Sequence, residues 1–303
     1  MISASASPAL ENGSERGTQA TLVEQACAKI NLSLHIVGRR PDGYHLLESL
    51  VAFTEHGDGL HFNAGCDLQL EIVGPFSAGL ESNDGNLVMR AARALGASGC
   101  SIVLDKRLPV ASGIGGGSAD AAATLRGLMR RDGRVIDAAE LKALALRLGA
   151  DVPVCLDQRV CFMSGIGEVI TPVPALPDVA VLLVNPLVGV ATADVFRGLG
   201  LGIGPREGSE HPVLPTSWRS AGDLAAFVAT CRNDLEAPAL AIAPVIGDVL
   251  AALRQQKGCE AARMSGSGAT CFGLFETIAL AEEAKATILR QSPQWWGMAS
   301  RLR

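Results

Sequence analysis

Leu108-Pro-Val-Ala-Ser-Gly-Ile-Gly-Gly-Gly-Ser-Ala-Asp-Ala121 is the most informative stretch of this chain. Gly113 and the glycines at 115–117 come directly before a segment with helical spacing, residues 119–131. Glycine lets backbone N–H groups approach a ligand closely. The start of a helix adds unpaired N–H groups and the positive end of the helix dipole. The stretch therefore predicts an anion site, and phosphate is the obvious anion.

Ser118 is expected at the N-cap of this helix, where its hydroxyl could cap the helix, touch phosphate or reach a magnesium ion. The alternative is a flexible loop before an ordinary capped helix. No Gly-Lys-Ser/Thr follows, so this is not a Walker loop, and the G-x-G-x-x-G pattern of dinucleotide binding is incomplete. A second glycine loop, residues 265–270, is either a tight turn or a second wall of a polyphosphate cleft.

The rest of the chain mixes strands and helices. Alternating patterns predict strands over 26–36, 67–73 and 101–104, and helical spacing predicts helices over 87–95, 119–131, 138–148, 242–253 and 278–289. Further strands are expected at 179–184 and 271–275. Because there is no strict βαβ rhythm, the α+β class is favoured over a doubly wound sheet. Glycines and prolines after residue 161 suggest a boundary, and we predict an extension over 1–20 and domains over 21–163 and 164–303.

Five residues stand out as candidates for a site. Lys29 and Asn31 lie on one face of the first strand, which is either a solvent face or a face turned into a cleft. Asp151 enters an apolar stretch, where a carboxylate is costly unless it is paired or used; a turn or cap role is the alternative. Tyr44 and His45 follow a Pro-Asp-Gly turn and could bind a base or anchor a hairpin.

The bulk composition excludes several classes of protein. The 303 residues are 48% hydrophobic and 19% charged, which excludes a wholly disordered chain. The net charge of -5 and the lack of a basic stripe argue against a nucleic-acid partner. The eight cysteines form no C-x-x-C pair, so we predict reduced thiols and no metal site of the protein's own. We expect neither a membrane span nor a secretory signal, and we expect the first 20 residues to be disordered in a cytoplasmic protein.

In chain order these motifs resemble those of the GHMP kinases. The stretch from residue 109 to 123 matches the ATP loop of that superfamily. Ala26-Cys-Ala-Lys-Ile-Asn-Leu32 and Gly38-Arg-Arg-Pro-Asp-Gly-Tyr-His45 are more specific, and they are similar to the 4-diphosphocytidyl-2-C-methyl-D-erythritol kinases of the non-mevalonate isoprenoid pathway. Residues 148–154 and 263–270 fit the same family, so the resemblance covers nearly everything after about residue 26.

The resemblance implies a two-domain GHMP kinase fold and a role for each candidate residue. The N-terminal domain would be like domain 2 of ribosomal protein S5 and the C-terminal domain ferredoxin-like. Lys29 and Asp151 match the catalytic pair, and Asn31, Tyr44 and His45 fall where the family holds its substrate. The implied ATP-binding residues are Pro109, Val110, Ala111, Ser112, Gly113, Ile114, Gly115, Gly116, Gly117, Ser118 and Ala119, with Asn86, Asp105 and Lys106 near the nucleotide pocket.

Two departures from the family pattern leave the phosphate contacts open. The family usually has glycine in place of Ala111 and Ser112, and Ser-Ser in place of Ser118-Ala119. The fold implied by the resemblance does not depend on these positions.

The implied activity is ATP- and Mg²⁺-dependent phosphorylation of the 2-hydroxyl of 4-diphosphocytidyl-2-C-methyl-D-erythritol, by a monomer or weak homodimer. One alternative is another GHMP kinase, acting on mevalonate, homoserine or a sugar; Tyr44 and His45 favour the cytidyl substrate. A second alternative is a non-catalytic nucleotide-binding protein, but the presence of Lys29 and Asp151 argues against it. An NAD-linked oxidoreductase would need the dinucleotide fingerprint that is missing.

Overall fold

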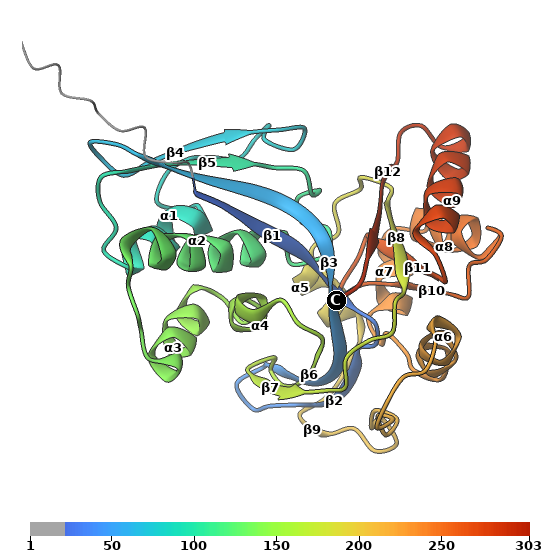
Figure 1. Cartoon of the computed structure of the whole chain (residues 1–303). Coiled ribbons are helices and arrows are strands. Elements are labelled where there is room, and N and C mark those ends of the chain that lie inside the picture. Colours follow the sequence, from blue (N-terminus) through green and yellow to red (C-terminus); the bar gives the residue numbers. More distant parts are fainter. Residues whose placement is uncertain (1–21) are drawn as a thin grey trace, which may run out of the picture.

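The structure, a computed structural model, describes residues 22–303. The extension predicted over residues 1–20 lies outside the described residues. Figure 1 shows two sheets side by side, with helices on the outer side of each. The long strand β3 (His45–Ala64) curves through the whole length of the larger sheet.

The larger sheet is organised around β3, which pairs antiparallel with four other strands. These partners are β1 (Leu22–Asn31), β2 (His35–Arg39), β5 (Cys100–Asp105) and β6 (Cys161–Gly165). The sheet is extended by β4 (Gln69–Val73), which runs parallel to β5, by β7 (Val169–Pro172) next to β6, and by β9 (Gly204–Pro205) next to β2. One strand thus connects the two ends of this sheet.

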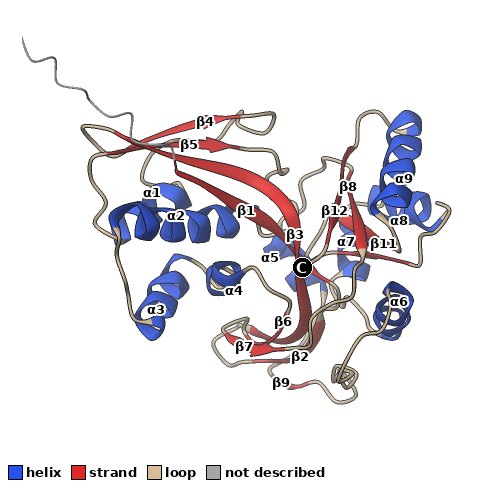
Figure 2. Ribbon diagram, viewed as in Figure 1, coloured by secondary structure: helices blue, strands red, loops and turns tan. Residues whose placement is uncertain are grey.

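Four helices cover one face of the larger sheet (Figure 2). They are α1 (Leu87–Ala94), α2 (Gly116–Asp132), α3 (Ala138–Leu148) and α4 (Val152–Asp157). Helix α2 packs against β1 and β3 through apolar residues, among them Ala121, Ala122 and Leu125, all fully buried. Its Gly127 has no room for a side chain, because a Cβ there would lie 2.2 Å from the Phe62 ring. Close packing of α2 on the sheet fixes where the N-terminus of this helix lies.

The second sheet has the strand order β10-β11-β8-β12, antiparallel throughout. Its strands are β10 (Ala261–Met264), β11 (Cys271–Phe275), β8 (Ala180–Asn185) and β12 (Trp296–Arg301). The remaining helices are α5 (Thr192–Gly198), α6 (Ala221–Thr230), α7 (Glu236–Ile242), α8 (Val245–Arg254) and α9 (Ile278–Gln291). One buried cluster contains Ile30 and Leu50 of the larger sheet together with Val181 and Phe272 of the second, so the two sheets share a core. The predicted α+β class is confirmed.

The strand expected over residues 26–36 is wrong as one element. It divides into β1 and β2 because the N–H groups of Leu32 and Ser33 both donate to Leu50 O, and Leu34 N donates to Arg232 O outside the sheet. Both faces of β1 are covered from Ala26 onward, and Lys29 and Asn31 are only 5% and 3% exposed. Their face is therefore not a solvent face.

Helix α2 begins at Gly116, with Gly115 at the N-cap in a left-handed conformation (φ 65°). The expectation that Ser118 is the N-cap is wrong, since Ser118 lies inside the first turn. The helix ends at the predicted glycine, Gly133, with φ 60°. The helix expected over 242–253 is interrupted: α7 ends at Ile242, and α8 begins at Val245 after Pro244.

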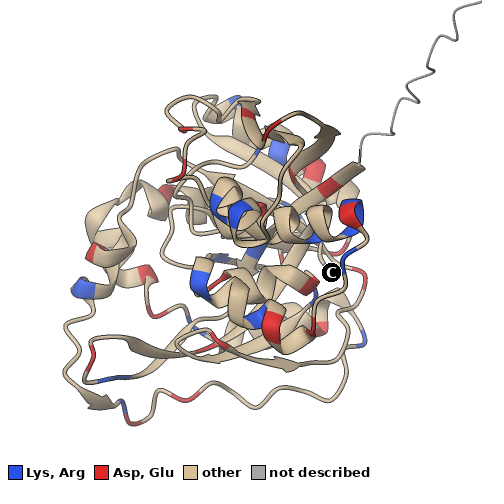
Figure 3. Ribbon diagram, turned by 90° about the vertical axis from the view of Figure 1, so that its left-hand side faces the viewer, with Lys and Arg blue, Asp and Glu red and all other residues tan. Residues whose placement is uncertain are grey.

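The expected boundary between residues 163 and 164 falls within β6, and the division into domains stays a prediction. No helix among residues 22–303 is long and apolar enough to cross a membrane. Lysines and arginines alternate with acidic residues over the side of the molecule drawn in Figure 3.

Candidate active site

A cavity of about 680 Å³ lies where the loop before α2 meets the second glycine loop. We call it the phosphate cavity, and residues 109–119 the phosphate loop. Its walls come from distant parts of the sequence: Lys29, Asp151, Gly115 and Gly266 all line it. The prediction that residues 265–270 form a second wall of the cleft is supported by Gly266 and Ser267, which also line the cavity.

The phosphate loop presents backbone N–H groups to this cavity. The first hydrogen bond of α2 runs from Ala119 N to Gly115 O (2.8 Å), so the N–H groups of residues 116–118 precede the hydrogen-bonded helix. Glycines at 115–117 line the cavity without side chains in front of the backbone. The start of α2 therefore offers a positive, donor-rich surface suited to phosphate.

The two glycine loops cross at very close range. A Cβ atom on Gly113 (φ 76°) would lie 2.5 Å from Ser265 O, and one on Gly266 (φ 55°) would lie 2.7 Å from Gly113 O. Ser265 Oγ donates to Gly113 O (3.1 Å), and Thr270 N donates to Ser112 O (3.1 Å). Glycine is thus required at 113 and 266 by both conformation and space.

Lys29 and Asp151 form an ion pair in the cavity, with 3.1 Å between Nζ and Oδ2. Lys29 lies on β1, and its N–H donates to Ile114 O of the phosphate loop (2.9 Å). The Lys29 side chain is 6% exposed, while that of Asp151 is 39% exposed. Asp151 occupies the N-cap of α4 but makes no side-chain capping bond. Its carboxylate is therefore available to the cavity, which the cap interpretation did not foresee.

Asn31 completes the surroundings of the Lys29 ammonium. Its Oδ1 accepts from Lys29 Nζ (3.2 Å), and its backbone N–H donates to Ser265 Oγ of the second glycine loop (3.1 Å). Two acceptors, one charged and one neutral, thus hold the ammonium at the cavity wall. The sequence resemblance placed Asn31 at the substrate, and it does line the phosphate cavity.

A second lysine lies under the phosphate loop. Lys106 Nζ contacts Asp58 Oδ2 (2.5 Å) and Asp120 Oδ2 (2.6 Å), and all three side chains are at most 5% exposed. Asp58 Oδ1 also accepts the N–H groups of Arg107 (2.6 Å) and Leu108 (2.8 Å). We call Asp58, Lys106 and Asp120 the buried triad. It joins β3, the end of β5 and the first turns of α2, and sequence reasoning found only its lysine.

Burial and the charges of their neighbours shift the pKa values of Asp120 and Lys106 in the buried triad. Burial and the neighbouring Asp58 carboxylate raise the pKa of Asp120 to about 7, although the Lys106 ammonium acts in the opposite direction. Burial alone would lower the pKa of Lys106, but the Asp120 and Asp58 carboxylates outweigh it and raise that pKa above its ordinary value. Lys106 therefore stays charged and belongs to the structural support of the loop.

An adjoining cavity of about 650 Å³, the outer cavity, holds the aromatic residues. Tyr44 and His45 line it, and the His45 ring lies 4.9 Å from that of Phe196 on α5. Tyr44 is 59% exposed, so its ring faces open space. Burial and the nearby Arg39 lower the pKa of His45, which favours the neutral ring. Leu47, Ile166 and Phe196 line both cavities and connect them.

Most of the predicted residues meet at these cavities. Nine residues of the phosphate loop line the phosphate cavity, whereas Ile114 and Ala119 are fully buried behind it. Asn86 lines the cavity and caps α1, but Asp105 lies elsewhere and pairs with Arg107. Phe196 was missed because α5 was not predicted, and nothing near it in sequence marks an aromatic wall.

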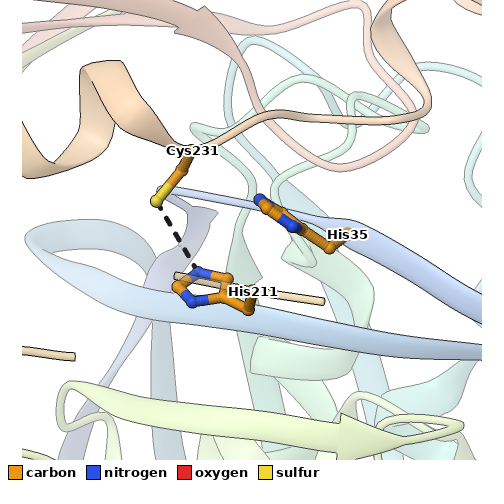
Figure 4. Close-up of side chains that lie close together, drawn as sticks. All are labelled: His35, His211 and Cys231. Atoms are coloured by element: carbon orange, nitrogen blue, oxygen red, sulfur yellow. Dashed lines mark hydrogen bonds between the residues drawn. The ribbon is translucent and has the colours of Figure 1, made fainter. Parts of the chain in front are cut away.

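His35, His211 and Cys231 form a separate cluster, shown in Figure 4. The ring nitrogens of both histidines already have hydrogen-bond partners. His35 Nδ1 faces the carbonyls of Ser209 and Glu210 (3.3 and 3.1 Å), and its Nε2 accepts Arg232 N–H (3.0 Å). With no lone pair left on His35, the cluster does not offer three ligands to a metal ion. It fastens the loop before α6 to β2.

Comparison with known proteins gives consistent results. The GHMP kinases N terminal domain matches residues 86–165, and the GHMP kinases C terminal domain matches residues 217–293. A 4-diphosphocytidyl-2-C-methyl-D-erythritol kinase of Cereibacter sphaeroides is 51% identical over 89% of this chain and 95% of its own. One of Methylorubrum extorquens is 52% identical over 93% of this chain and 99% of its own.

The fold agrees with a solved structure from the same group. The crystal structure of a 4-(cytidine 5'-diphospho)-2C-methyl-D-erythritol kinase superposes with a TM-score of 0.73 and 34% identity. The match covers 93% of this chain and 99% of the other. The two-domain fold that the resemblance implied is confirmed by these matches together with the two domain matches. On sequence and fold alike, this chain belongs to the 4-diphosphocytidyl-2-C-methyl-D-erythritol kinase family of the GHMP kinases.

Proposed function

We propose that this protein transfers the γ-phosphoryl group of ATP to the 2-hydroxyl of 4-diphosphocytidyl-2-C-methyl-D-erythritol, in the non-mevalonate pathway to isoprenoid precursors. The observation that carries the proposal is the Lys29–Asp151 ion pair, set in a cavity lined by two glycine loops. The relatives named above, about half identical to this chain over most of its length, support the choice of substrate.

Asp151 is the proposed base. Its carboxylate takes, or orients, the proton of the 2-hydroxyl while that oxygen bonds to the γ-phosphorus. The bond between the γ-phosphorus and the bridging oxygen of ADP then breaks, and ADP leaves with the electron pair. The hydroxyl is tertiary and weakly acidic, so a positioned base is useful. Lys29 stabilises the Asp151 carboxylate and the charge near the transferring group.

The phosphate loop supplies alignment. Phosphoryl transfer needs mostly positioning and charge neutralisation, and the N–H groups at the start of α2 provide donors that need no rearrangement. We assign the ATP phosphates to residues 113–118, the proposed centre of the ATP-binding stretch Pro109 to Ala119. Lys106 acts from below by holding the loop through Asp58 and Asp120.

Mg²⁺ accompanies ATP in this proposal. The phosphate cavity offers the half-exposed Asp151 carboxylate and the Ser118 hydroxyl, both oxygen donors. Few protein oxygens are enough, because Mg²⁺ keeps waters and binds phosphate oxygens alongside one or two side chains. The Ser118 hydroxyl would hold the ion, which supplies charge neutralisation at the phosphates, and the Asp151 carboxylate is left to act as the base.

The outer cavity is proposed to hold the cytidine end of the substrate. Tyr44 presents an open aromatic face, and His45 and Phe196 form an aromatic wall next to it. A planar base stacks on such side chains, and a neutral imidazole can hydrogen-bond its edge. Asn31 lines the phosphate cavity beside Lys29, where it can contact the erythritol part. This arrangement favours a cytidyl substrate over mevalonate, homoserine or a sugar.

The decisive experiment incubates the protein with ATP, Mg²⁺ and the cytidyl substrate and detects the product by mass spectrometry. We expect a product heavier by one phosphoryl group, formed with consumption of ATP. Mevalonate, homoserine and galactose are tested in parallel. Phosphorylation of one of these without the cytidyl compound would contradict the proposed substrate, and binding of ATP without turnover on any of them would favour a non-catalytic protein. We further propose a cytoplasmic monomer or weak homodimer without a nucleic-acid or membrane partner.

A further inference from the structure

Behind Lys29 and Asn31, two more buried groups continue the hydrogen bonding away from the cavity. Asn31 Nδ2 donates to Ser49 Oγ (2.8 Å), and Ser49 Oγ donates to Ser33 O (2.5 Å). Ser49 lies on β3, the partner strand of β1, and is fully buried. It lines neither the phosphate cavity nor the outer cavity. Any effect of Ser49 on the reaction must therefore pass through Asn31.

The direction of this chain is fixed by counting protons. A serine hydroxyl has one hydrogen, and Ser49 gives it to Ser33 O. Ser49 can then only accept from Asn31, so the amide NH₂ of Asn31 must face Ser49. The amide oxygen is left to face Lys29 Nζ, at 3.2 Å.

The reversed amide would be unfavourable at both ends. Its NH₂ group would face the Lys29 ammonium, donor against donor. Its oxygen would draw the Ser49 hydrogen away and leave Ser33 O without that donor. All of these groups are buried, where an unmet hydrogen bond is costly.

We propose that Ser49 is a positioning residue, which orients the Asn31 amide so that Oδ1 holds the Lys29 ammonium against Asp151. This inference rests on the proposed function, since it supposes that Lys29 and Asp151 serve phosphoryl transfer. A neutral acceptor suits this role because it steadies the ammonium without competing with the Asp151 carboxylate for its charge. Without Ser49 the amide is free to turn, and Lys29 loses its second acceptor.

The test compares Ser49→Ala, Asn31→Ala and the double variant in steady-state kinetics with the cytidyl substrate. Ser49→Ala is expected to lower kcat by roughly tenfold while the KM for ATP stays within about twofold, because the lost contact orients the transfer step and not the nucleotide. In the Asn31→Ala background, Ser49→Ala is expected to change kcat by less than about twofold, since the group it orients is absent.

Two further variants separate positioning from general damage. Ser49→Thr keeps the hydroxyl and is expected to restore kcat to within about threefold of wild type. Ser300→Ala removes another buried serine, which accepts the Glu55 N–H (3.0 Å) and lines neither cavity. It is expected to leave kcat unchanged within about twofold.

The outcomes distinguish this inference from the proposed function. Wild-type protein without turnover on the cytidyl substrate would defeat the proposed function itself. With an active wild type, the positioning role is overturned by Ser49→Ala retaining kcat within about twofold, or by an equal loss of kcat in the presence and absence of Asn31. The double-variant comparison decides the question even if Ser49→Thr does not fit into the core.

Discussion

Asp151 combines two features that separate it from an ordinary helix cap. It stands at the start of α4, yet it makes no capping hydrogen bond and pairs instead with a lysine from β1. Half-exposure leaves part of the carboxylate open to a ligand. A residue that serves only to begin a helix has no need of a buried ammonium, so we assign Asp151 to the chemistry.

Asp151→Asn is therefore expected to lower kcat by roughly 10²- to 10⁴-fold, because an amide cannot take up the proton. ATP affinity should change little, since the phosphate loop is unaltered. Single-turnover kinetics and calorimetric titration with a non-hydrolysable ATP analogue measure the two quantities. Turnover within about threefold of wild type would remove Asp151 from the role of base.

Gly113 and Gly79 allow backbone strain to be separated from steric conflict. Both have similar φ values, 76° and 79°, but a Cβ on Gly79 meets nothing within 4 Å, whereas on Gly113 it meets Ser265 O at 2.5 Å. Gly79→Ala should cost about 1 kcal/mol of unfolding free energy. Gly113→Ala should lower the free energy of unfolding by more than Gly79→Ala does, because the two crossing loops must move apart. For the same reason it should weaken ATP binding by roughly tenfold or more. Urea unfolding and nucleotide titration measure the two quantities. Equal effects of the two substitutions would contradict this account.

Among the elements, β3 decides how the site is built. Opposite β1 its register shifts between Cys27 and Lys29, so that residues 54–56 bulge out of the pairing. Gly57 follows, where a Cβ would lie 2.0 Å from Ala26 O, and then Asp58 reaches Lys106. The bulge thus supplies the carboxylate that anchors the phosphate loop from below.

Lys106→Met should lower the free energy of unfolding by about 3–5 kcal/mol, because it leaves the two buried carboxylates Asp58 and Asp120 without their cation. Lys285→Met on α9, which removes a surface pair with Glu282, should cost less than about 0.5 kcal/mol. Urea unfolding of both variants measures these differences. Similar losses for the two lysines would show that the buried triad is not a significant anchor.

Local patterns in the sequence predicted the elements whose stability is local. Helix α3 and strand β11 have the predicted bounds, and Gly133 ends α2 as expected. Strand β3 was not predicted at all: Glu55-His-Gly-Asp-Gly59 is typical of a turn, whereas here it lies within one long strand and forms a bulge held by neighbouring strands. Lys29 and Asp151 stood out as polar residues in apolar surroundings, and the family motifs implied their roles. Phe196, Asp58 and Ser49 act through long-range contacts that no local pattern records.

At the scale of the whole molecule, the loop before α6 is held to the larger sheet by the half-buried ring of His211. This ring packs against His35, Phe162 and Phe227, and Ser33 Oγ lies 2.6 Å from its Nε2. Burial lowers the pKa of His211 to about 4, with the charges of His35 and Arg232 acting in the same direction and Glu48 opposing them. The folded protein therefore favours the neutral ring.

The sign of the resulting pH dependence is definite. Because the folded pKa lies below the ordinary 6.5, the His211 contribution to stability is complete above pH 6.5 and is lost as the pH falls toward about 4. His211→Gln should be less stable than wild type near neutral pH but lose less stability across that interval. Urea unfolding at several pH values tests this, and parallel curves for the two proteins would contradict it. His35, whose pKa is also lowered by burial, contributes slope of the same sign in both proteins.

The crossing of the two glycine loops has a consequence for how the chain acquires its fold. Gly113 and Ser265 touch although 152 positions separate them along the chain. Closing so long a segment is entropically demanding, and contacts of this kind form late in folding. The phosphate cavity is therefore still incomplete on a growing or partly collapsed chain, and ATP cannot bind there. It can stabilise the finished molecule by mass action, but it cannot act as a template that guides the earlier steps.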